Sequence, residues 1–141
     1  MFDEMVIHKR LVRLETVLRK FRTLSECSER EYLEKEPLQD QAERNLQIAI
    51  QVCIDIASHL VASFGFRSPE NYGDIFVVLR EEGLIGGEVC TIMRNMAGLR
   101  NILVHGYLDI KPHLIYQQLQ SLDDFCQFAE AIACIMQQCE D

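Results

Sequence analysis

Apolar residues recur at helical spacing along most of this chain. In the N-terminal segment they follow alternating steps of four and three residues, which places them on one face of an α-helix. These residues are Ile7, Leu11, Leu14, Leu18 and Phe21. No segment alternates apolar and polar residues as a half-buried strand does. The pattern therefore predicts an all-α protein.

Prolines and glycines divide this pattern into about five predicted helices. A long first helix should end at Glu36-Pro37, because proline disfavours a helical conformation in the residue before it. The second covers about 38–64 with Gly65 as its cap, the third runs from Ser68-Pro69-Glu70 to about Gly83, the fourth follows Gly86-Gly87, and the fifth follows Pro112. We expect an up-and-down bundle of these helices in one domain, residues 1–141.

The fifth predicted helix carries two apolar stripes. The first has a heptad spacing and consists of Ile115, Leu119, Leu122, Cys126, Ala129, Ala133 and Met136. The second consists of Phe125, Phe128, Ile132 and Ile135. Together the stripes form a face wider than one neighbouring helix covers. A homodimer and a deep core within one subunit both explain such a face.

The charge of the chain excludes general attraction to nucleic acid. The net charge is −8, from 22 acidic and 14 basic residues. Residues 1–25 differ, since they hold six Lys and Arg against three acids, a local charge of +3. An acidic protein that contacts RNA must use a local cluster of cations, and the first helix together with Arg94 could supply one.

Several other classes of protein are not indicated. No run of 18 uninterrupted apolar residues is present, and the N-terminal MFDEMVIHKR lacks a secretory pattern, so we expect a cytoplasmic protein without a membrane segment. The six cysteines form no CxxC pair, which predicts free thiols, no metal site and no cofactor. Asp55 and His59 could form an exposed i,i+4 pair or, less simply, hold a metal.

The segment RNILVHGY, residues 100–107, gathers polar side chains at the end of the fourth predicted helix. We take residues 89, 92, 96, 99 and 103 as the core-facing stripe of this helix. At about 100° per residue, Asn101 and His105 share a face opposite that stripe, whereas Arg100 and Tyr107 flank it. An ordinary exposed helix end and a catalytic constellation both fit this spacing.

A family resemblance adds to this pattern. The Arg, four residues, His, one residue, Tyr arrangement of RNILVHGY resembles the signature of the HepT-type ribonuclease toxins of the HEPN superfamily. The flanking MAGLRNILVHGYLDI (96–110) and the upstream ERNLQIAIQVCIDIASHL (43–60) are similar to that family as well. The resemblance covers essentially the whole chain, including the predicted helical layout.

The resemblance implies an assembly and a means of control. It implies a HEPN-like homodimer whose two motifs meet to form one RNA-cleaving cleft. It also implies a partner, an MntA-type minimal nucleotidyltransferase that acts as antitoxin by transferring AMP to the motif tyrosine, here Tyr107. Whether toxin and antitoxin assemble further is left open by the sequence.

The motif residues suit cleavage of RNA without a metal. His105 can transfer protons near neutral pH, and Arg100 presents a fork of donors to phosphate oxygens. Asn101 could orient the imidazole or donate to phosphate. We therefore predict an endoribonuclease toxin of a type VII-like toxin–antitoxin system, in which the 2′-hydroxyl attacks the phosphate.

A non-catalytic role remains as an alternative. The same bundle could be a helical substrate-binding or regulatory subunit of a nucleotidyltransferase, with Arg100 and His105 gripping a nucleotide or phosphate. A plain dimerisation module is a third possibility, although it leaves the polar motif without a role.

Overall fold

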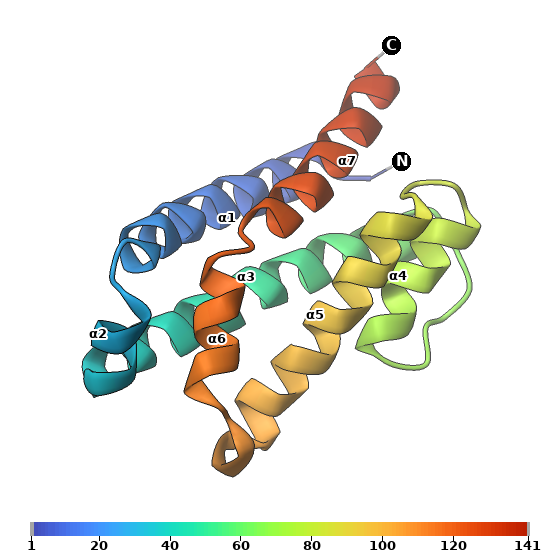
Figure 1. The fold of residues 1–141 in the computed structure, drawn as a ribbon. Helices are drawn as coiled ribbons and strands as arrows, with labels where there is room; N and C mark the ends of the chain where they lie inside the picture. Colours follow the sequence, from blue (N-terminus) through green and yellow to red (C-terminus); the bar gives the residue numbers. More distant parts are fainter. Residues whose placement is uncertain (1, 141) are drawn as a thin grey trace.

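Helices make up most of the described chain, residues 2–140, in this computed structural model (Figure 1). In this range there are seven α-helices and one short 3-10 helix: α1 Glu4–Ser25, α2 Glu29–Glu34, α3 Glu36–Ser63, α4 Tyr72–Glu81, α5 Gly87–His105, η1 Tyr107–Asp109, α6 Pro112–Leu119 and α7 Asp123–Glu140. The side chains of Tyr107, Cys139 and Glu140 lie outside the description. The prediction of an all-α protein is confirmed.

The first predicted helix is divided in two. α1 ends at Ser25, and α2 begins after Ser28, whose side-chain oxygen accepts from the backbone N–H of Glu31 at 3.1 Å. The Ser28 hydroxyl also lies 3.4 Å from the Glu31 carboxylate, so the pair resembles a capping box. The prediction of one continuous helix up to Pro37 was therefore wrong. The predicted break before Pro37 is confirmed, since Lys35 is extended and α3 starts at Glu36.

The fifth predicted helix is also divided, into α6 and α7. After Leu119 the backbone N–H groups of Gln120 and Ser121 donate to the carbonyls of Gln117 and Gln118, three residues back. These tighter bonds end the α-helical ladder before α7 begins at Asp123. The chain thus forms seven α-helices within the described residues, where the sequence predicted about five.

Glycines end two helices as predicted. Gly65 and Gly83 both have positive φ, +67° and +74°, a conformation that suits a residue without a β-carbon. After α3 the N–H of Phe66 reaches back to the carbonyl of Val61, and after α4 the N–H of Leu84 reaches back to Leu79. The start of α4 was predicted too early, because its N-cap is Asn71, which accepts from the N–H of Asp74 at 2.8 Å.

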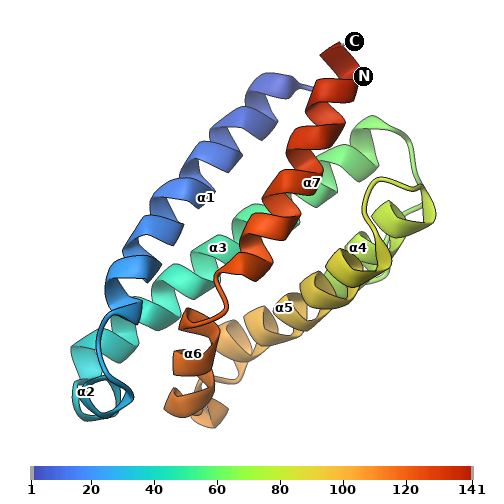
Figure 2. The ribbon, with the colours of Figure 1, turned by 45° about the horizontal axis from the view of Figure 1, so that its top comes forward.

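The core surrounds α3, which contacts α1, α4, α5 and α6 (Figures 1 and 2). α7 closes the core with its second apolar stripe, from which Phe125 stacks on Phe21 of α1 and Phe128 meets Phe76 of α4 edge to face. The other stripe of α7 stays partly at the surface, and Ala133 in it is exposed. Within this subunit, therefore, only one of the two stripes of the wide apolar face is fully buried.

α3 is long and apolar enough to cross a membrane by length and composition alone. However, 56% of that stretch is buried inside the protein. Its apolar character is that of a core helix packed on several sides by its own neighbours.

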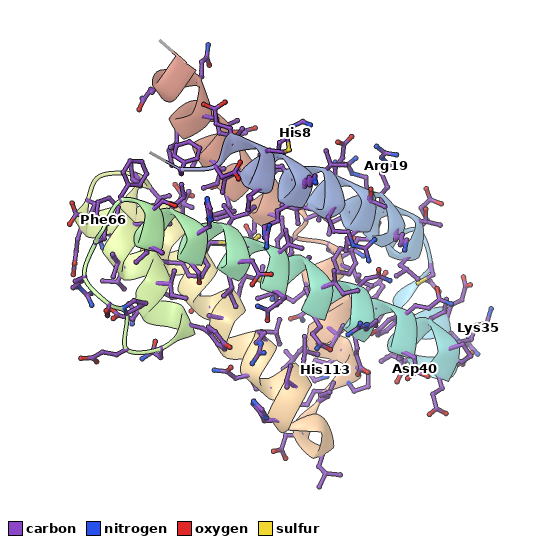
Figure 3. The ribbon with its side chains drawn as sticks, turned by 180° about the vertical axis from the view of Figure 1, so that it is seen from behind. His8, Arg19, Lys35, Asp40, Phe66 and His113 are labelled. Atoms are coloured by element: carbon purple, nitrogen blue, oxygen red, sulfur yellow. The ribbon has the colours of Figure 1, made fainter. Side chains whose placement is uncertain are left out.

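The chain termini and the end of α5 lie at opposite ends of the bundle. Near the end of α3, Phe2 packs on Phe64 and the Asp3 N–H donates to His59 Nε2 at 3.1 Å. Both chain termini lie towards this end, whereas α5 finishes at the other (Figures 1 and 2). Figure 3 shows the same two ends from behind, with Phe66 at one and Lys35 at the other.

The cysteines in the described part of the chain are free. Cys53 and Cys90 are buried, and burial raises the pKa of both thiols. Cys27 and Cys126 are half-buried and Cys134 is exposed, while the side chain of Cys139 lies outside the description.

Candidate functional site

α5 carries the motif, but it is rotated relative to the prediction. Its buried residues are Cys90, Met93, Met96, Ala97 and Leu103. Val89, Ile92 and Leu99, three members of the predicted stripe, are only half-buried. The rotation arises because α5 packs on both α3 and α4, so that its buried face is shared between them. Arg100 consequently lies on the side of α5 that faces α3.

Arg100 is held by three neighbours. Its Nε donates to Oε1 of Gln51 on α3 at 3.2 Å, and the guanidinium carbon lies 4.7 Å from the ring centroid of Tyr72 at the start of α4. This second contact is a cation–π interaction. A longer contact of 3.5 Å joins Nη1 to the side-chain oxygen of Asn101. The guanidinium is therefore half-buried and oriented before any substrate arrives.

Gln51 has its own partner, which fixes the direction of its amide. Its Nε2 donates to Oδ1 of Asp55 at 2.9 Å, so Oε1 is left to accept from Arg100. Asp55 therefore does not pair with His59 as predicted. His59 instead accepts from the Asp3 N–H and lies 3.4 Å from the Ser63 hydroxyl. Within the described residues, no three His, Cys, Asp or Glu side chains gather as a metal site would require.

Asn101 and His105 occupy the exposed face of α5, as the helical wheel predicted. No hydrogen bond or ion pair within the described residues involves the His105 imidazole. Gln51 and Tyr72 hold the Arg100 guanidinium on the side of α5 that faces α3 and α4. One subunit thus presents an oriented arginine and a free histidine as separate groups.

The helix ends directly after His105. The Gly106 N–H closes the last turn by donating to the carbonyl of Ile102 at 2.9 Å, and Tyr107 opens η1. A β-carbon at position 106 would lie 3.3 Å from that same carbonyl oxygen, so the turn is tight. The sequence predicted that the Tyr107 side chain flanks the core-facing stripe, but this side chain is outside the described part of the structure.

A polar pocket of about 460 Å³ lies between the start of α4 and the middle of α5. Its lining includes Asn71, Tyr72, Arg94, Asn95, Gly98 and Asn101. Arg94 therefore lies beside the motif, as expected. The cations of the first helix do not, since α1 lies on the other side of α3 from α5 (Figures 1 and 2).

Arg67 fixes the loop that precedes α4. It donates to both carboxylate oxygens of Asp74, at 2.8 and 2.9 Å, and to both of Glu81, at 2.9 and 3.1 Å. Hydrogen bonds from Arg67, helped by the Glu70 N–H, lower the pKa of Asp74 to about 2. The pKa of Glu81 is lowered by the same guanidinium. One guanidinium thus pairs with two ionised carboxylates, and these bonds fix the loop that precedes Tyr72.

Gln51 and Tyr72 were missed by the sequence analysis. Gln51 lies in the segment 43–60 that carries part of the family resemblance, and its i,i+4 relation to Asp55 was visible. Tyr72 has no spacing relation to Arg100 in the chain. Only the packing of α3, α4 and α5 brings the three side chains together.

An all-α bundle with an arginine and a histidine at the end of α5 defines a protein of the HEPN class. The family described as Ribonuclease HepT-like matches residues 14–132, and the chain belongs to this family. The resemblance to HepT-type ribonuclease toxins is therefore confirmed, and the chain is a member of a family of ribonucleases.

Two nucleases match most of the chain in sequence. It is 30% identical over 128 residues to an mRNA nuclease HepT of Shewanella oneidensis, a match that spans 84% of this chain and 96% of that protein. It is 26% identical over 117 residues to a tRNA nuclease HepT of Aphanizomenon flos-aquae, across 83% of this chain and 80% of the relative.

A solved structure agrees with this membership. The fold matches a tri-AMPylated HEPN toxin of Shewanella oneidensis, solved in complex with an MNT antitoxin, with a TM-score of 0.85 and 27% identity. The match covers 95% of this chain and 99% of that one. The chain therefore shares both its family and its fold with a protein that was solved as a toxin bound to its antitoxin.

Proposed function

We propose that the whole chain, residues 1–141, acts as one domain and is a metal-independent endoribonuclease toxin of the cytoplasm, with Arg100 and His105 as its catalytic residues. The observation that carries the proposal is that Gln51 and Tyr72 fix the Arg100 guanidinium, five residues before the exposed His105 on the same helix. Phosphodiester cleavage requires a cation for the phosphate and an acid–base group, and the motif supplies one of each on different sides of α5.

The reaction follows from these groups. A base removes the proton of the 2′-hydroxyl, the oxygen attacks the adjacent phosphorus, and an acid protonates the departing 5′-oxygen. The products are a 2′,3′-cyclic phosphate and a 5′-hydroxyl. Arg100 donates to the non-bridging oxygens as negative charge builds on them. Asn101, on the face of α5 that holds His105, supports this by orienting the imidazole or by donating to phosphate.

The reaction needs two proton-transferring groups, and the motif supplies one histidine. In a homodimer two motifs would meet, with one His105 as base and the other as acid. Exposed apolar side chains next to the motif support such a contact: Ile102, Leu108 and Leu114 are 45%, 85% and 45% exposed. Exposed apolar groups clustered near a polar site are typical of a surface that another protein covers.

The antitoxin in this proposal is an MntA-type nucleotidyltransferase, which silences the enzyme by transferring AMP to Tyr107. The bond formed joins the tyrosine oxygen to the α-phosphorus of ATP, and pyrophosphate leaves. The added phosphate is an anion next to the cleft, so it would repel RNA as well as block it. The tri-AMPylated relative in its antitoxin complex supports this form of control.

Cleavage of RNA in EDTA by the purified protein tests the activity. We expect Arg100→Ala and His105→Ala each to lower the rate by about 100-fold or more, because each removes a group that acts in the transition state. His113→Ala is the matched control, since His113 is an exposed histidine on α6 (Figure 3). Undiminished cleavage in both motif variants would assign the activity to a contaminating nuclease. A 5′-phosphate product, or strict dependence on a divalent cation, would contradict the mechanism.

Mass spectrometry tests the control step. Co-expression with the nucleotidyltransferase should add AMP to the wild-type chain and not to Tyr107→Phe, whereas Tyr116→Phe should be modified like the wild type. Modification that persists in Tyr107→Phe would place the acceptor elsewhere.

A further inference from the structure

The polar pocket between α4 and α5 adjoins the motif but is separate from the Arg100–Gln51 contact. Tyr72 and Asn101 connect the two, because both line the pocket and both contact the Arg100 guanidinium. A second hollow of about 360 Å³ shares the same two side chains. A ligand in the pocket would therefore sit directly beside the proposed catalytic arginine.

Three side chains of this pocket keep unused hydrogen-bonding capacity. Within the described residues, Arg94 forms no ion pair and the Asn95 amide has no hydrogen-bond partner. Asn101 makes only its long contact as an acceptor, so its NH₂ group is unused. Asn95 and Asn101 are both exposed. The pocket thus offers a guanidinium and two amides to a ligand.

Two acidic residues also line the pocket, Glu70 and Asp74, and the Glu70 carboxylate forms no hydrogen bond or ion pair within the described residues. Asn71 caps α4, and Asp74 is bound by Arg67 on both oxygens. Arg67 is shared between Asp74 and Glu81, so it offsets only part of their charge, and Asp74 still interacts electrostatically with Arg94. The pocket is therefore not positive overall, and a ligand would be held by Arg94 at one point and by uncharged contacts with Tyr72, Asn95 and Asn101 elsewhere.

Gly98 keeps the pocket open. It lies on the pocket wall in the middle of α5, and a β-carbon added there would meet nothing within 4 Å. An alanine methyl group at this position would therefore displace no neighbour, and a larger side chain would start from the wall of the pocket. Glycine in a helix interior lowers helix stability by about 1 kcal/mol relative to alanine, so helix formation does not explain its presence.

We propose that this pocket binds one unpaired nucleotide of the RNA strand next to the bond that is cleaved. The volume lies within the roughly 300–1,000 Å³ of small-ligand sites, which suits a single nucleotide and not a duplex. Tyr72 is 39% exposed and offers its ring to the base. The amides of Asn95 and Asn101 match donors and acceptors on a base edge, and Arg94 binds a phosphate. This inference rests on the proposed function, because it takes the substrate to be RNA.

Filling the pocket tests the inference. The probe is a fluorescently labelled 2′-O-methyl RNA, which cannot be cleaved by 2′-hydroxyl attack, and the readout is its dissociation constant by anisotropy. Gly98→Leu should weaken binding by about tenfold or more, since the loss of one stacked base has an effect of that size. Gly98→Ala, the matched control, should bind within about twofold of wild type. Both variants raise helix propensity, so neither should unfold α5.

A second variant examines base recognition. Asn95→Ala should flatten any base preference that the wild type shows among homopolymeric 2′-O-methyl probes, with a smaller loss of overall affinity. Wild-type affinity in Gly98→Leu would overturn the inference. If Gly98→Leu alters the oligomeric state, the test rests on Asn95→Ala. Unchanged affinity and unchanged base preference in Asn95→Ala would then overturn the inference.

The nuclease proposal and the pocket inference can be contradicted separately. If the wild type cleaves no RNA but binds the probe in a manner that depends on Gly98, the nuclease proposal is wrong and the pocket is still a nucleotide site. If wild-type RNA cleavage is confirmed and binding ignores both Gly98 and Asn95, the pocket inference alone is wrong.

Discussion

Arg100 donates from Nε to Oε1 of Gln51 at 3.2 Å, although 49 positions separate the two residues in the chain. Asp55 accepts from the same Gln51 amide at 2.9 Å, so the direction of the arginine is set by two side chains on α3. The central helix of the core thereby orients a residue of the motif on α5. Packing of α3 against α5 and the geometry of the site are physically linked.

Replacing Gln51 should make the Arg100 side chain less well oriented. Gln51→Leu removes the acceptor of Nε, and we expect RNA cleavage to fall by about tenfold, since a hydrogen bond to a charged group is worth about 1.5–3 kcal/mol. Single-turnover cleavage rates measure the effect. Gln47→Leu is the matched control, a half-buried glutamine one turn earlier on α3. Equal losses in both variants would mean that only the packing of α3 matters.

A charge at the apolar surface beside the motif should separate the proposed dimer. Ile102→Glu is expected to raise the dimer dissociation constant by about 100-fold or more, because an unpaired carboxylate would be buried in both halves of a symmetric contact. Sedimentation analysis measures it, and cleavage should fall in parallel. Val12→Glu is the control, since Val12 on α1 is 47% exposed against 45% for Ile102. A dimer that survives in Ile102→Glu would contradict this contact surface.

Two tyrosines in contact should respond oppositely to loss of their hydroxyls. The Tyr32 ring is fully buried, and its hydroxyl has no partner within the described residues, whereas the Tyr116 hydroxyl donates to the Cys27 carbonyl at 2.9 Å. Tyr32→Phe should leave the free energy of unfolding unchanged or raise it by up to about 1 kcal/mol. Tyr116→Phe should lower it by about 1 kcal/mol. Urea unfolding compares them, and a clear loss in Tyr32→Phe would indicate a bound water.

The Arg67 cluster should make stability depend on pH. The pKa values of Asp74 and Glu81 are lower in the folded chain than in the unfolded one. Folding is therefore favoured by this cluster above about pH 5, and the contribution is lost as the pH falls through about 4 towards the folded pKa of Asp74, about 2. The gap in urea midpoint between wild type and Arg67→Met should be largest at neutral pH and shrink on acidification.

An exposed pair provides the control for that measurement. Arg30 and Glu34 form an i,i+4 contact of 3.1 Å with side chains 87% and 63% exposed. Arg30→Met should leave the midpoint nearly unchanged at every pH, since such surface pairs contribute little. A gap for Arg67→Met that does not change between pH 7 and pH 3 would show that its carboxylate partners are not the cause.

Local patterns were sufficient for part of the fold. Periodicity gave the helical class, and Gly65, Gly83 and Pro37 marked real boundaries because each restricts its own backbone or that of its neighbour. The break at Ser28 was missed although Ser28 and Glu31 have the spacing of a capping box. It was obscured by the polar character of the surrounding segment, in which no apolar stripe marks a change of helix.

The site was only partly predictable. Arg100, Asn101 and His105 follow from the motif and from one helix, so their exposed or half-buried positions could be estimated on a wheel. The rotation of α5 could not, because it depends on how three helices share one core. Gln51 and Tyr72 reach Arg100 only through that packing, and no spacing within the chain specifies such a contact.

Gly98 has a consequence for engineering this protein. Alanine and leucine both raise helix propensity relative to glycine, and the alanine methyl group would meet nothing within 4 Å, so a screen for thermal tolerance alone would favour such replacements. Leucine would reach further into the pocket that Tyr72 also lines. At the proposed nucleotide pocket, heat resistance and substrate selection would thus compete at one position, and a stabilised variant should be checked for a changed choice of RNA.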